Sequence, residues 1–130
     1  MGVLEDKDEI RELMRRYNQA IDFPDPKAWV DCFTDDAVVE ITGRPPLTGK
    51  DELLAYAEQR PGGSLHLATS EIIDVSGDTA HVSSYLALVS AASGTPGIMA
   101  GGKYEDDLRR VDGAWKFSRR NLEMTIRPGG

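Results

Sequence analysis

Hydrophobic residues recur at helical spacing over roughly the first sixty positions and at alternate positions over the rest of the chain. This change of period predicts helices first and strands afterwards. We expect the first helix to end at Asp22 or Phe23, because Pro24 disfavours helical geometry in the residue before it. The apolar stripe of this helix consists of Ile10, Leu13, Met14, Tyr17 and Ile21.

Two shorter helices and one strand are predicted in the remainder of the helical part. Asp25 followed by Pro26 is typical of an N-cap and a first helical residue, so the second helix is expected to begin there. A strand is expected over residues 37–41 and a third helix over about residues 49–59.

The second half of the chain predicts an antiparallel meander joined by short turns that contain glycine. In its last strand the apolar positions change from odd numbers, at Trp115 and Phe117, to even numbers, at Leu122 and Met124. A β-bulge near residues 118–120 would reconcile the two registers and bend the sheet. Helices laid on the concave side of such a sheet leave a cavity between the two layers. The expected strands are residues 64–75, 79–92, 98–111 and 114–127.

Composition and charge exclude several classes of partner. The chain has 15 basic and 22 acidic residues and a net charge of -7, so nucleic acid would be repelled. The single cysteine, Cys32, cannot form an internal disulfide, and no apolar run approaches the roughly 20 residues of a membrane span. The first residues also lack the pattern of a signal peptide. We therefore expect a cytoplasmic protein that binds neither membrane nor nucleic acid.

Short motifs along nearly the whole chain resemble one known family. They are the helix over residues 10–22, Phe33-Thr34-Asp35-Asp36-Ala37, Gly49, Gly77-Asp78-Thr79-Ala80, Tyr104-Glu105-Asp106 and Asp112-Gly113-Ala114-Trp115. Together they resemble the SnoaL-like branch of the NTF2-like superfamily. The resemblance implies a single α+β domain over residues 1–130. Its fold would be a cystatin-like cone in which three N-terminal helices pack on a strongly curved antiparallel sheet.

The resemblance also implies a set of catalytic residues. Tyr17, Asp22 and His66 fall where bile-acid 7α-dehydratases carry a catalytic tyrosine, aspartate and histidine, and lindane dehydrochlorinase and scytalone dehydratase carry a related Asp–His pair. The dehydratase's further aspartate and arginine fall at Leu88 and Met124. The chain thus has the Asp–His pair of these enzymes but a less polar ligand site than the bile-acid dehydratases. The resemblance therefore implies acid–base chemistry without a cofactor.

The residues themselves support the same positions. His66 alternates with leucines along the first meander strand, and small residues at Ala68 and Ser70 leave room for a ligand beside an imidazole that exchanges protons near neutral pH. Asp22 lies in the last helical turn, where the helix dipole disfavours a carboxylate, so a cationic partner such as His66 is expected. The alternatives are a structural core role for His66 or Tyr17 and a turn-capping role for Asp22.

Two classes of function remain open. One is a dehydratase-like lyase or isomerase for a small hydrophobic or cyclic substrate, with epoxide hydrolysis or polyketide cyclisation as the alternative chemistry. The other is a noncatalytic small-molecule binding module. No metal site is expected, since no Cys/His cluster has suitable spacing. We expect a homodimer through the outer sheet face, where Val89 and Ala91 are unusually apolar. The pocket is expected to be lined by Trp29, Phe33, Leu88, Met99, Tyr104, Leu122 and Met124.

Overall fold

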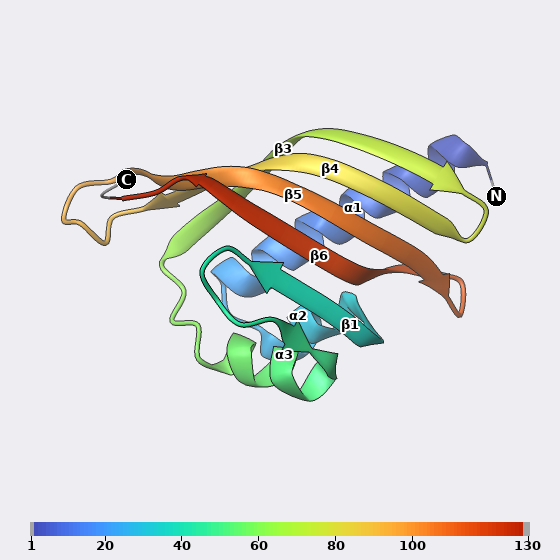
Figure 1. The fold of residues 1–130 in the computed structure, drawn as a ribbon, viewed down its shortest axis with the longest axis horizontal. Helices are drawn as coiled ribbons and strands as arrows, with labels where there is room; N and C mark the ends of the chain where they lie inside the picture. Colours follow the sequence, from blue (N-terminus) through green and yellow to red (C-terminus); the bar gives the residue numbers. More distant parts are fainter. Residues whose placement is uncertain (1, 129–130) are drawn as a thin grey trace.

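The computed structural model describes residues 2–128 and has helices packed on one curved, unclosed sheet (Figure 1). The helix α1 crosses one face of the sheet, and α2 and α3 lie beside it near β1. The helices are α1 (Val3–Asp22), α2 (Pro26–Asp31) and α3 (Gly49–Glu58). The strands are β1 (Phe33–Ile41), β2 (Leu47–Thr48), β3 (Ser64–Ser76), β4 (Thr79–Ser90), β5 (Gly97–Val111) and β6 (Ala114–Ile126).

The predicted elements are present, with differences at their ends. The first helix ends at Asp22 as expected, and the side chain of Asp25 caps α2 by accepting a hydrogen bond from the backbone N–H of Ala28 at 3.2 Å. The first strand begins four residues before the predicted start, because Phe33 already pairs with Phe117 of β6. The sequence pattern did not indicate the two-residue strand β2.

The sheet is mixed rather than purely antiparallel. Its strand order is β2-β1-β6-β5-β4-β3, and the last four strands form the expected antiparallel meander. The strand β1 instead runs parallel to β6, whereas the family resemblance implied a purely antiparallel sheet. A parallel pair requires a long crossover connection, and here the crossover comprises α3 and the strands β2 to β5. This pairing brings the N-terminal half of the chain against its last strand.

A bulge in β6 lies where the apolar register changes. Asp107 pairs with Arg119 and Leu108 pairs with Phe117, so Ser118 has no partner on β5. The Ser118 hydroxyl donates to the backbone carbonyl of Asp107 at 3.0 Å. The predicted bulge is thereby confirmed. It places Phe117 and Arg120 on the same buried face of the sheet although their positions differ in parity.

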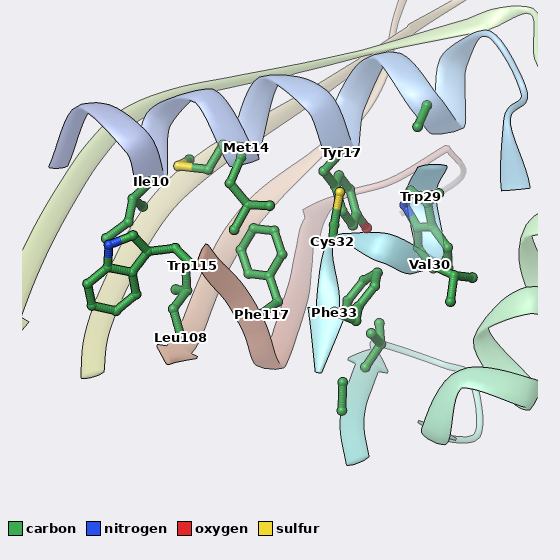
Figure 2. Close-up of a cluster of buried hydrophobic side chains, with 14 of the residues drawn as sticks. Ile10, Met14, Tyr17, Trp29, Val30, Cys32, Phe33, Leu108, Trp115 and Phe117 are labelled. Carbon is green, nitrogen blue, oxygen red and sulfur yellow. The ribbon is translucent and has the colours of Figure 1, made fainter. Parts of the chain in front are cut away.

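Aromatic rings hold α1 and α2 against the sheet (Figure 2). Tyr17 of α1 contacts Trp29, Phe33 and Phe117, with ring centroids 5.4, 5.9 and 5.7 Å apart. Trp29 and Phe33 also meet edge to face at 4.8 Å. Tilted and edge-to-face pairs of this kind contribute about 0.5–1.5 kcal/mol each beyond the burial of their surfaces. The ring of Tyr17 is therefore fixed by its neighbours.

A buried ion pair lies beside these rings. Arg120 Nε donates to Asp106 Oδ1 at 3.1 Å, and both side chains are almost completely buried. The guanidinium carbon lies 3.6 Å from the ring centre of Tyr104 and 4.3 Å from that of Tyr17. Burial raises the pKa of Asp106 to about 6, against the opposing charge of Arg120. The pair gives the core a fixed positive charge stacked on two phenol rings.

The outer face of the sheet carries apolar side chains toward one end. Neighbouring strands place Leu65, Leu67, Tyr85, Ile98 and Ile126 there, each 45–70% exposed. Patches of this kind on a soluble protein are frequent sites of association. The expectation of a homodimer through this face stays a prediction.

The ion pair gives a test of what stabilises the fold. Asp106→Ala leaves Arg120 buried without its carboxylate, so the free energy of unfolding should fall by about 3–5 kcal/mol. Asp107→Ala is the matched control, because it removes an exposed carboxylate on the same strand and should cost no more than about 1 kcal/mol. Urea unfolding followed by circular dichroism measures both. Equal losses for the two variants would contradict a structural role for the buried pair.

Candidate functional site

A cavity of about 450 Å³ opens between the end of α1, the loop after β1, the end of α3 and the curved meander strands. Its volume lies within the range of small-molecule sites. The wall combines a hydrophobic body with a few polar groups. The lining residues are Tyr17, Ile21, Asp22, Ile41, Thr42, Arg44, Tyr56, Arg60, Pro61, Gly62, Ser64, His66, Leu86, Leu88, Tyr104, Leu122 and Met124.

His66 and Asp22 are in direct contact at the wall of this cavity. His66 Nδ1 lies 2.5 Å from Asp22 Oδ1, and the backbone N–H of His66 donates to Asp22 Oδ2 at 2.9 Å. The Asp22 side chain is 6% exposed and that of His66 is 24% exposed. Both carboxylate oxygens are therefore occupied by one residue of β3, and the imidazole remains accessible from the cavity.

The local sequence explains why the carboxylate points this way. The helix α1 ends as the backbone N–H of Phe23 donates to Gln19 O, and Pro24 then directs the chain toward α2. Asp22 thus sits at the negative end of the helix, where a buried carboxylate is unfavourable. The two donors of His66 offset this cost. They give the carboxylate partners that the helix end itself does not provide.

A glycine lets β3 approach the helix end. Gly62 lies just before β3 with a φ of +75°, and a Cβ built there would be 3.1 Å from the carbonyl oxygen of Asp22 and 3.0 Å from Pro24 Cδ. A side chain there would be in tighter contact than usual and would also be strained by the positive φ, and glycine avoids both costs. Glycine at this position therefore lets the start of β3 pass close to the end of α1.

The contact determines which nitrogen of His66 is free. An ionised carboxylate only accepts hydrogen bonds, so Nδ1 of a neutral imidazole must carry the proton that faces Asp22. Among residues 2–128, no side chain or backbone group forms a hydrogen bond with Nε2. The Nε2 lone pair is therefore available to a molecule in the cavity.

Two phenols face the same cavity. Burial raises the pKa of Tyr17 well above its usual value and that of Tyr104 to about 12, although Arg120 beneath both rings acts in the opposite direction. Both groups keep their protons at neutral pH. Within residues 2–128 neither hydroxyl has a hydrogen-bond partner, so each can donate to a ligand.

The structure brings together only part of the predicted pocket. Leu88, Tyr104, Leu122 and Met124 line the cavity as expected. Trp29 and Phe33 do not, because both are 1% exposed within the aromatic core that supports Tyr17. Met99 is also absent from the lining. It is the extra residue at a bulge, since Leu88 pairs with Ala100 and Val89 with Ile98.

Several lining residues had no signal in the sequence. Ile21, Ile41 and Leu86 are apolar residues in predicted elements, and periodicity alone could have assigned them to the core. Arg44 and Arg60 lie in segments that read as loops, so nothing in the pattern placed them at a cavity. Their positions follow from the packing of α3 against β1.

The second histidine lies elsewhere. His81 is exposed on the outer sheet face, where Nδ1 lies 2.9 Å from Asp107 Oδ1 and Nε2 lies 2.7 Å from Glu105 Oε2. The hydrogen bond to Asp107, followed by that to Glu105, raises the pKa of His81 above 6.5. Any stabilisation from this cluster is present at pH values below 6.5 and is lost as the pH rises through the raised pKa.

Residues 2–128 lack two other features. No three His, Cys, Asp or Glu side chains there are arranged to hold a metal ion. In the same part of the chain, no helix combines the length and apolar character that crossing a membrane would require.

Comparison with known proteins identifies relatives of the whole fold. The family model described as SnoaL-like domain matches residues 2–121. A protein of unknown function from Mycobacterium tuberculosis is 30% identical, with a TM-score of 0.86 over 95% of this chain and 76% of that one. An NTF2-like protein with a cystatin-like fold from Novosphingobium aromaticivorans is 25% identical, with a TM-score of 0.87 over 98% of this chain and 86% of that one.

A third relative carries a name that refers to a reaction. It is a scytalone dehydratase-like protein from Novosphingobium aromaticivorans, 25% identical, with a TM-score of 0.81 over 98% of this chain and 95% of the other. The resemblance seen in the sequence motifs is thus confirmed over the whole fold.

The close approach at Gly62 can be tested with a matched pair of glycines. Gly62→Ala and Gly63→Ala both place a side chain at positive φ, but a Cβ at Gly63 has no atom within 4 Å. Backbone strain should therefore lower the free energy of unfolding of both variants by about 1–2 kcal/mol. The free energy of unfolding of Gly62→Ala should fall further, because its new side chain also collides with the end of α1. Thermal unfolding of both variants measures the difference. Equal losses would show that the contact with Asp22 O imposes no constraint.

Proposed function

Because the chain belongs to the SnoaL-like family, we propose that it is a cofactor-independent acid–base enzyme acting on a small hydrophobic or cyclic substrate. The reaction class is a dehydratase-like elimination or an isomerisation. His66 is the general base, Asp22 orients it, and Tyr17 donates a hydrogen bond to a substrate oxygen.

The contact between His66 and Asp22 at the cavity wall carries this proposal. A carboxylate on Nδ1 holds the imidazole in one orientation and stabilises the imidazolium that forms when Nε2 accepts a proton. A histidine that serves only to bind a neutral ligand has no need of a buried carboxylate behind it. The pairing is what a base requires.

The proposed reaction begins at a carbon next to a carbonyl. Nε2 removes a proton from this carbon, and the phenol of Tyr17 donates to the carbonyl oxygen as negative charge develops there. In an elimination, the electron pair then forms a carbon–carbon double bond while the bond to a hydroxyl oxygen breaks. That oxygen takes a proton from the imidazolium of His66 and leaves as water. In an isomerisation the same proton returns to a different carbon.

The relatives support this class of chemistry. SnoaL-like and NTF2-like proteins include cofactor-independent dehydratases and cyclases. The fold of the scytalone dehydratase-like neighbour matches 98% of this chain. Epoxide hydrolysis or polyketide cyclisation would use the same base on water or on another acidic carbon. A noncatalytic binding module is the alternative from a different class, and the apolar wall formed by Leu86, Leu122 and Met124 would suit it equally.

Two further properties belong to the proposal. The exposed apolar patch on the outer sheet face supports a homodimer.

The thiol of Cys32 is buried and its pKa is raised to about 11, chiefly by that burial, so it stays reduced and unreactive. A cytoplasmic location agrees with such a thiol.

Deuterium exchange tests the proposal without knowledge of the product. Hydrophobic cyclic ketones incubated with the protein in D₂O should gain deuterium next to the carbonyl, as followed by NMR. His66→Ala should abolish the exchange, and Asp22→Asn should slow it by about 100-fold or more. Tyr17→Phe should slow it by about 10- to 100-fold, since one hydrogen bond to developing charge is lost. The wild-type rate should depend on pH, because only the unprotonated base can accept a proton from the ketone.

His81→Ala is the control, because this histidine lies outside the cavity and should leave the rate unchanged. Exchange that is independent of pH between about 5 and 9, or that survives His66→Ala within about twofold, would contradict the assignment of the base. A binding module would show no exchange. Its ligand affinity would fall modestly with His66→Ala and hardly change with Asp22→Asn.

A further inference from the structure

The cavity mouth carries positive charge that the acid–base pair does not use. Among the lining residues, Asp22 is the one acid, and both of its oxygens are bonded to His66. The remaining charged lining residues are Arg44 and Arg60. The cavity therefore has an excess of positive charge in a chain whose net charge is -7.

Neither arginine is neutralised by the protein. Within residues 2–128, no carboxylate forms an ion pair with Arg44 or Arg60, whereas Arg109 and Arg119 on the sheet each bind an acid. Arg60 is partly buried, and its Nε is inaccessible to solvent and has no hydrogen-bond partner in the described part of the chain. A buried donor without an acceptor is costly, so Arg60 has hydrogen-bonding and charge-pairing capacity that the described part of the chain does not satisfy.

One aromatic ring positions both guanidinium groups. The guanidinium carbon of Arg60 lies 4.5 Å from the ring centre of Tyr56 in α3, and that of Arg44 lies 5.7 Å from the same centre. Arg44 belongs to the loop between β1 and β2, and Arg60 follows α3, so two distant segments converge here. Two cations held against one ring repel each other, and an anion that contacts both removes this repulsion.

We infer that the substrate carries a carboxylate, which Arg44 and Arg60 bind at the cavity mouth. This inference deepens the proposed function and rests on it for the assumption that the cavity holds the substrate. The hydrophobic body of the substrate then lies against Leu86 and Leu122, and its reacting carbon faces His66. The guanidinium group is planar and binds a carboxylate through two parallel hydrogen bonds, which fixes orientation as well as position.

The substrate class is thus a small hydrophobic monocarboxylic acid. A phosphate or sulfate ester would offer similar oxygens, and the experiment includes that case. A neutral molecule of the same shape would contact the apolar wall but would leave both guanidinium groups without an anionic partner. Charge at the mouth therefore selects among molecules of equal size.

Calorimetric titration with three naphthalene probes tests the inference. The probes are 2-naphthoate, its neutral amide 2-naphthamide, and 2-naphthyl phosphate. Wild type should bind 2-naphthoate about 10-fold or more tighter than the amide. Arg44→Gln and Arg60→Gln should each weaken 2-naphthoate by about 3- to 10-fold and leave the amide unchanged. Arg15→Gln removes the same charge from an exposed position on α1 and should change neither affinity.

His66→Ala separates this inference from the proposed function. The variant should still bind 2-naphthoate about 10-fold or more tighter than 2-naphthamide, even if no enzymatic activity is ever found. Equal affinity of wild type for acid and amide, or no binding of either, would overturn the inference. Tighter binding of the phosphate than of the carboxylate would overturn the choice of carboxylate. If Arg15→Gln weakened 2-naphthoate as much as Arg60→Gln does, the effect would come from the net charge of the protein and not from a binding site, and the inference would be wrong.

Discussion

The contact between Asp22 and His66 ties the end of α1 to the beginning of β3, and the geometry of the cavity depends on it. A buried carboxylate at the negative end of a helix is unfavourable, and an accessible imidazole has many orientations. Two hydrogen bonds from His66 occupy both oxygens of the Asp22 carboxylate. They offset the unfavourable burial of the carboxylate and restrict the orientation of the imidazole. Neither side chain would hold its position alone. The strand and the helix therefore meet at a point defined by polar geometry as well as by apolar packing.

Curvature of the sheet provides the space beside this contact. The bulge at Ser118 in β6 is followed by a second irregularity, where Gly101 pairs with Ile126 but Gly102 pairs with Met124. A Cβ at Gly102 would lie 2.2 Å from the carbonyl oxygen of Glu123, so β5 and β6 can approach there only with glycine at this position. In β3, Ser70 adopts a φ of +57° at a further shift of register. Irregularities of this kind bend long strands, and the cavity lies against the curved part of the sheet.

The sequence predicted what depends on local patterns. Helix ends at Asp22, the meander strands and the bulge near Ser118 all follow from periodicity, proline and glycine, which act over a few residues. The contact of Asp22 with His66 was expected from family positions and from the misplaced charge. The parallel pairing of β1 with β6 was missed, because contacts between distant segments leave no local pattern. Trp29 and Phe33 were assigned to the pocket for the same reason, since an aromatic residue at helical spacing can face a closed core or an open cavity. The convergence of Arg44 and Arg60 on Tyr56 likewise exists only in the folded chain.

The protonation of His66 in the free protein tests the central claim most directly, because it requires no substrate. Two-bond proton–nitrogen correlation spectra distinguish the neutral tautomers of the two histidines, His66 and His81, at pH about 9. The contact with Asp22 predicts that His66 carries its proton on Nδ1 and leaves Nε2 unprotonated. Asp22→Asn should shift the population toward the Nε2–H tautomer. A wild-type His66 with its proton on Nε2 would contradict the account, since that nitrogen could not then accept a proton from a substrate.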